Sequence, residues 1–161
     1  MTNVTTIERA AVEAAIPHRD PFLFVDRILE EAEGHIRTEW TVPADASWFE
    51  GHYPREPVTP GVILCEHVFQ SGAIYVSRQL KGFRESDGIP VMSKIEGARF
   101  KRLVRPGETL ETKVSLVERV GPAWYLTGVS TMSGKTIMRT TFVLTATSAA
   151  RDALAEGAAP R

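Results

Sequence analysis

His52 and Glu66 have the residue types and the surroundings of an acid/base pair. His52 lies in a loop whose backbone is restricted by Pro54, Pro57 and Pro60, and a restricted loop can hold a base in one place. An imidazole titrates near neutral pH, so it can accept a proton from carbon when the resulting enolate is stabilised. A lone loop histidine is more often a surface residue, and the assignment therefore rests on the prolines.

Glu66 is the single acidic residue between positions 58 and 77. Its neighbours on one helical face, at i−4, i+3 and i+7, are Val62, Phe69 and Ala73. An outward-pointing carboxylate is the alternative, but this apolar stripe favours burial. Burial favours the protonated form, which a general acid needs in order to protonate a departing hydroxyl group.

Three further positions near Glu66 have predicted roles. Gln70 is one helical turn further on, where it can hydrogen-bond the carboxyl group. Pro60 and Gly61 start the helix, so the amides of Gly61 and Val62 have no acceptor within it and can polarise a carbonyl oxygen. Proline and glycine also simply bound helices, and both interpretations can hold together.

The element that carries Glu66 is predicted as a helix from Gly61 to Lys81, apolar on most of its circumference and hence buried. A short helix is expected at 6–14, ended by Ile16-Pro17. Alternating polarity and the turn residues at 33–34, 121–122 and 133–134 predict strands at 22–30, 35–42, 90–104, 109–120, 123–132 and 136–147. One buried helix against an antiparallel sheet of five or six strands is an α+β architecture.

Composition excludes several functional classes. The 161 residues fit one domain, at 1–147, followed by a tail at 148–161 that we expect to be flexible. A net charge of −1 gives no global bias towards nucleic acid or a membrane surface. No signal sequence or membrane span is recognised, and Cys65 is the single cysteine, so we expect a cytoplasmic protein without an internal disulfide. Neither metal-ligand spacing nor a nucleotide-binding motif is present, which predicts no metal and no cofactor.

The stretch 51–66 (GHYPREPVTPGVILCE) resembles the signature of the 3-hydroxyacyl-acyl-carrier-protein dehydratases, hot-dog-fold enzymes that remove water from an acyl thioester. Residues 17–26 (PHRDPFLFVD) resemble the family's N-terminal motif, and 98–108 (ARFKRLVRPGE) its later strand and turn. Together the resemblance covers about residues 16–110. Glutamate at position 66 is similar to the branch that dehydrates without isomerising the double bond. The resemblance implies a hot-dog fold, with the sheet wrapped around the helix.

The resemblance also implies a mechanism. His52 removes the proton from C2, the Gly61 and Val62 amides hold the enolate oxygen, and Glu66 protonates the departing C3 hydroxyl. The product is a trans-2-enoyl thioester of fatty-acid or related acyl or polyketide biosynthesis. The implied partner is acyl-carrier protein, and the implied assembly is a homodimer with shared sites, which a trimer of dimers would extend. His18 is assigned a structural or interface role.

Some residues depart from the family pattern near the expected acyl chain. His67 and Phe69 replace small residues, Thr59 replaces a large apolar one, and Tyr53 replaces phenylalanine. Phe69 shares a helical face with Glu66, so we predict that it narrows the acyl tunnel.

Carrier recognition is predicted at a basic cluster, because the carrier's recognition helix is acidic. The cluster contains Lys94, Arg99, Lys101, Arg102 and Arg105. Two other functions remain compatible with the sequence. One is thioester hydrolysis on the same fold, with Glu66 activating water, and the other is a non-catalytic acyl-binding subunit.

Overall fold

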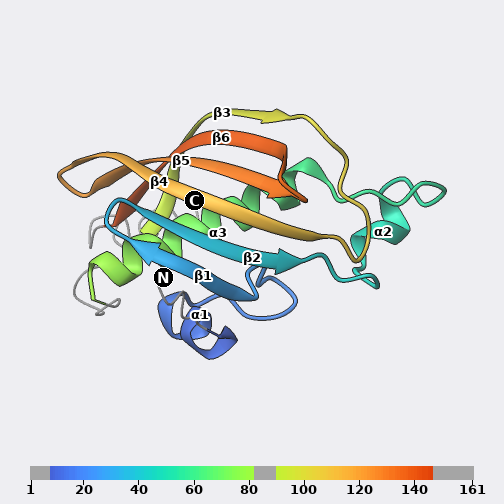
Figure 1. Cartoon of the computed structure of the whole chain (residues 1–161), viewed down its shortest axis with the longest axis horizontal. Helices are drawn as coiled ribbons and strands as arrows, with labels where there is room; N and C mark the ends of the chain where they lie inside the picture. The colour runs from blue at the N-terminus through green and yellow to red at the C-terminus, as the bar shows by residue number, and fades with distance from the viewer. Residues whose placement is uncertain (1–7, 82–89, 147–161) are drawn as a thin grey trace, which may run out of the picture.

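The structure, a computed structural model, describes residues 8–81 and 90–146. Figure 1 shows α3 running along one face of the sheet, with α1 beside β1. In chain order the elements are α1 (Arg9–Ala15), β1 (Arg27–Ala32), β2 (His35–Thr41), α2 (Trp48–Gly51), α3 (Gly61–Gln79), β3 (Pro90–Phe100), β4 (Thr109–Val120), β5 (Ala123–Met132) and β6 (Lys135–Ala146).

The six strands form one sheet in the order β1-β2-β4-β5-β6-β3, and every neighbouring pair is antiparallel. Helix α3 packs against β2, β3, β4, β5 and β6 (Figure 1). The predicted α+β hot-dog architecture is therefore confirmed. Strands β1 and β3 lie at the two edges of the sheet within one chain.

Strand alternation places the core between α3 and the sheet. In β5, Trp124, Leu126, Gly128 and Ser130 are buried, whereas the residues between them are partly exposed. Helix α3 comes close to the sheet at Gly128, where an added Cβ would collide with the side chain of Val68. Glycine at this position therefore sets the distance between the helix that carries the site and the sheet.

Several predicted boundaries were wrong. The strand expected at 22–30 begins at Arg27, because the backbone of residues 22–24 is bound by side chains of α3 and not by a neighbouring strand. The strand expected at 90–104 ends at Phe100, and α3 ends at Gln79, before Lys81.

Helix α2 was not predicted. The first helix begins at Arg9, and the proposed tail at 148–161 lies outside the described residues. Within 8–81 and 90–146, no helix is long and apolar enough to cross a membrane.

Candidate active site

Glu66 lies on the first turns of α3, beside a small cavity of about 70 Å³. Its side chain is 26% exposed. Burial raises the pKa of the Glu66 carboxyl group, although a hydrogen bond from Gln70 acts in the opposite direction. A raised pKa keeps more of the carboxyl group protonated, as a general acid requires. The cavity is lined by His18, Glu66, Phe69, Gln70, Ala73, Pro90, Met92 and Leu144.

Gln70 orients the Glu66 carboxyl group. Its Nε2 donates to Oε1 of Glu66 at 3.1 Å, as the helical spacing predicted, and also to the backbone oxygen of Phe22 at 3.1 Å. Its Oε1 accepts from the backbone N–H of Phe24 at 2.8 Å. Because the amide is held at both ends, one N–H remains directed at Glu66.

His18 lies on the same cavity, although the sequence suggested a structural or interface role. Its Nε2 is 3.7 Å from Oε1 of Glu66, and its buried Nδ1 has no hydrogen-bond partner among residues 8–81 and 90–146. Burial and then the charge of Arg19 lower the pKa of His18, which favours the neutral form of its ring. The sequence could not place His18 beside Glu66, because this placement depends on contacts between residues 22–24 and α3, which are far apart in the chain.

His52 follows α2 directly and is half-buried. Its Nδ1 is 3.1 Å from the backbone oxygen of Val58. Because a carbonyl oxygen only accepts, Nδ1 carries the proton, and Nε2 is left with the lone pair that a general base uses. The ring of Tyr53 packs edge-on against it, with centroids 4.7 Å apart.

One chain does not bring His52 and Glu66 into one cavity. His52 is absent from the lining of the Glu66 cavity, and its hydrogen bond holds it at Val58.

At the start of α3, Val62 is 75% exposed. Phe100 packs against Gly61, where an added Cβ would lie 3.0 Å from the ring. The first backbone amides of the helix with an acceptor are those of Ile63 and Leu64, which donate to the carbonyl oxygen of Pro60. The amides of Gly61 and Val62 have no acceptor in the described part of the chain.

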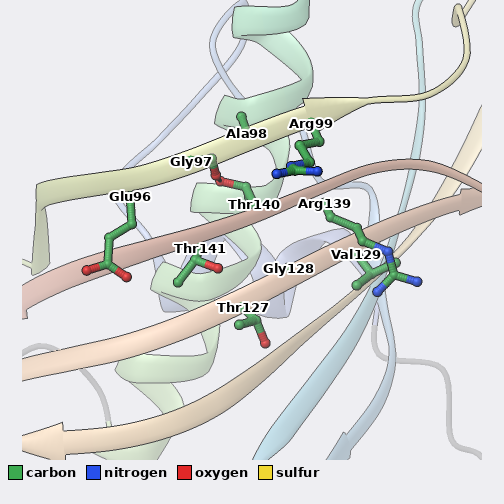
Figure 2. A pocket seen from close by; sticks show the side chains of 10 residues that line it. All are labelled: Glu96, Gly97, Ala98, Arg99, Thr127, Gly128, Val129, Arg139, Thr140 and Thr141. Atoms are coloured by element: carbon green, nitrogen blue, oxygen red, sulfur yellow. Dashed lines mark hydrogen bonds between the residues drawn. The ribbon is translucent and has the colours of Figure 1, made fainter.

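A larger hollow lies on the other face of the sheet. Figure 2 shows its lining on β3, β5 and β6, with α3 behind these strands. It measures about 550 Å³, but neither His52 nor Glu66 lines it, and its one carboxylate, Glu96, is paired with Lys94 at 2.8 Å. We therefore place the chemistry at the smaller cavity. The described residues also contain no group of three or more histidine, cysteine, aspartate or glutamate side chains placed to hold a metal ion.

A long helix packed on a six-stranded antiparallel sheet, with a partly buried carboxyl group near the start of that helix, defines a protein of the hot-dog class. Similar solved structures include the dehydratase heterocomplex ApeI:P from Xenorhabdus doucetiae, with a TM-score of 0.70 and 14% identity over 84% of this chain and 90% of that chain. A hypothetical thioesterase from Streptococcus pneumoniae, in complex with coenzyme A, has a TM-score of 0.56 and 16% identity over 74% and 84%. These likenesses concern the fold.

The chain belongs to the FabA-like family, because the model of the FabA-like domain matches residues 16–141. Its relatives include the 3-hydroxyacyl-[acyl-carrier-protein] dehydratase FabZ of Anaeromyxobacter dehalogenans, 35% identical over 138 residues, which are 85% of this chain and 88% of the relative. The FabZ of a Geobacillus species is 38% identical over 130 residues, which are 80% of this chain and 88% of the relative. The family resemblance inferred from the three sequence motifs is thereby confirmed.

Proposed function

We infer that this protein is a 3-hydroxyacyl-acyl-carrier-protein dehydratase of fatty-acid biosynthesis, a hydro-lyase that forms trans-2-enoyl thioesters. The observation that carries the inference is the Glu66 carboxyl group, which has a raised pKa and is oriented by Gln70 beside a small cavity, in a chain of the FabA-like family. FabZ enzymes are relatives over most of its length. This combination fits elimination of a hydroxyl group.

In the proposed reaction, Nε2 of His52 takes the proton from C2, and the amides of Gly61 and Val62 stabilise the negative charge on the thioester oxygen. The electron pair then forms the C2–C3 double bond as the C3–O bond breaks. Glu66 gives its proton to the departing oxygen, so the second product is water. The hydrogen bond at Nδ1 supports the role of His52, because it leaves Nε2 unprotonated.

We propose that each site combines His52 of one chain with Glu66 of a second chain. Within one chain His52 lies outside the Glu66 cavity. The surface around the start of α3 is apolar, with exposed side chains at Val62, Phe100 and Leu103, and β3 is an edge strand. An apolar surface beside a sheet edge suits a second copy related by two-fold symmetry. The further assembly of three such dimers into a trimer of dimers stays a prediction.

Acyl-carrier protein is the proposed substrate-bearing partner. Two members of the basic cluster that would contact it are already engaged in ion pairs within the chain. Lys94 is paired with Glu96, and Arg105 with Glu56 at 3.0 Å. Arg99, Lys101 and Arg102 are exposed and form no ion pair with the residues that the structure describes. We therefore expect these three side chains to contribute most to the encounter with an acidic carrier.

Incubation with a crotonyl thioester in water tests the function, because dehydration is reversible. We expect hydration to a 3-hydroxyacyl thioester, and a Glu66→Gln variant that is slower by about a hundredfold to ten-thousandfold. Release of free thiol without hydration would indicate a thioesterase. Binding without turnover would indicate a non-catalytic subunit, and full activity of a folded Glu66→Gln variant would exclude the assigned acid.

A further inference from the structure

His67 follows Glu66 directly, and it is fully buried, with 0% exposure. Both ring nitrogens have partners: Nδ1 lies 2.6 Å from the backbone oxygen of Phe24, and Nε2 lies 2.7 Å from Oγ1 of Thr112. The Phe24 carbonyl can only accept, so Nδ1 carries the hydrogen and Nε2 accepts from the Thr112 hydroxyl. Thr112 in turn accepts from Oγ of Ser130 at 2.7 Å. The direction of every hydrogen bond in this chain of groups is therefore fixed.

The sheet and α3 itself are adapted to this histidine. Small hydroxyl residues surround it where apolar residues would otherwise fill the core, and all are buried: Thr38, Ser71, Thr112 and Ser130. Ser71 donates to the backbone oxygen of His67 at 2.9 Å and accepts from Thr38 at 2.8 Å. Because its partners are satisfied, the buried imidazole is tolerated in the core, and its contact with Phe24 is the one that leads towards Glu66.

The network reaches the active site through the backbone of Phe24. The carbonyl of Phe24 accepts from His67, while its N–H donates to Oε1 of Gln70. One residue of an irregular segment is thus held by two side chains of α3 that are one turn apart. With Phe24 fixed, the Gln70 amide has one orientation, in which Nε2 donates to Glu66.

We propose that His67 is a positioning residue, which fixes the orientation of the Glu66 carboxyl group through Phe24 and Gln70. The inference rests on the proposed role of Glu66 as the acid. Burial lowers the pKa of His67 to about 4, although the bond to Phe24 acts in the opposite direction. The ring therefore stays neutral at working pH and brings no positive charge close to the carboxyl group that must hold a proton.

Two variants of similar polarity separate positioning from packing. The side-chain nitrogen of Asn in His67→Asn takes the place of Nδ1, so it can still donate to Phe24 but does not reach Thr112. The longer amide in His67→Gln reaches Thr112 in the place of Nε2 and leaves Phe24 without its donor. We expect His67→Gln to lower kcat by about tenfold at nearly unchanged KM, the loss that corresponds to one hydrogen bond. His67→Asn should keep kcat within a small factor of the wild type.

Thr112→Val is the matched control, because it breaks the same network on the side away from Glu66. It should destabilise the fold without lowering kcat. Equal kcat values for the folded Asn and Gln variants would overturn the proposal, and so would a Thr112→Val variant as impaired as His67→Gln.

Two additional experiments distinguish a failure of this proposal from a failure of the proposed function. Wild type that fails to hydrate the crotonyl thioester, or Glu66→Gln that retains activity, would count against the function. A crystal structure of His67→Gln tests the positioning role without any assay. We expect Gln70 to be turned away from Glu66 in that structure, and an unmoved Gln70 and carboxyl group would overturn the proposal whatever the activity.

Discussion

We predict that Phe69 limits the length of the acyl chain. Its ring lines the Glu66 cavity, is 9% exposed and packs against Phe142, with centroids 5.0 Å apart. Replacement by alanine removes the ring from one wall and extends the cavity towards Phe142. Each methylene group that enters the new space contributes about 0.8 kcal/mol, which is roughly a fourfold gain in kcat/KM. A substrate two carbons longer should therefore gain on the order of tenfold relative to the short substrate.

The assay is kcat/KM for a series of 3-hydroxyacyl pantetheine thioesters of increasing length, compared between the wild type and Phe69→Ala. The substitution also costs about 3–5 kcal/mol of stability, because it truncates a buried aromatic side chain. Rates must therefore be measured well below the unfolding temperature of the variant. The ratio of long-chain to short-chain kcat/KM does not depend on the fraction of folded enzyme, since that fraction cancels.

Phe142→Leu is the matched control, because Phe142 is the fully buried partner of Phe69 and does not line the cavity. It should lower stability and leave the chain-length ratio unchanged. An unchanged ratio in folded Phe69→Ala would refute the reasoning. The same shift in both variants would attribute the effect to a loosened core and not to the wall of the cavity.

Three further predictions concern assembly, docking and pH. Mixed dimers of His52→Ala with Glu66→Ala chains should regain one intact site in a hydration assay, and no recovery in proven heterodimers would place the pair within one chain. Arg102→Glu should slow turnover of carrier-bound substrate, more at low than at high salt, and spare the matching pantetheine thioester; equal loss on both would move the docking surface elsewhere. The pKa of His67 is about 4 in the fold against the usual 6.5 of an exposed imidazole, so the unfolded state binds the proton first as pH falls. The contribution of His67 to the free energy of unfolding should be fully present above pH 6.5 and should fall by about 3 kcal/mol towards pH 4. Urea unfolding at several pH values measures it, and the free energy of unfolding of His67→Asn should depend less on pH.

The long helix and the last three strands were predictable because their signals are local. Helix α3 is marked by Pro60 at its start and by apolar residues on most of its circumference. The turns at Gly121 and Gly134 have positive φ angles of 57° and 73°, which glycine adopts without strain. The spacing that placed Gln70 one turn after Glu66 is equally local, and their predicted hydrogen bond is present.

The start of β1 shows why other predictions failed. Phe22 to Val25 is an apolar run, and the pattern predicted a strand. In the structure the N–H of Phe24 and the carbonyl groups of Phe22 and Phe24 are bound by Gln70 and His67, residues far away in the sequence. The same long-range contacts put His18 beside Glu66. Here the side chains of a helix bind the backbone groups that a neighbouring strand would otherwise bind. Such contacts leave no periodic pattern in the sequence of the segment that is bound.

The neighbours of Glu66 suit the proposed role of this carboxyl group as an acid. The ring of His18 lies 3.7 Å from the carboxyl group, and burial lowers its pKa, while His67, the next residue in the chain, has a pKa of about 4. Gln70 is an amide without charge. A cation in any of these places would stabilise the carboxylate and lower the pKa of Glu66. Neutral donors instead fix the orientation of the group while burial raises its pKa, which favours the protonated form that the proposed acid needs.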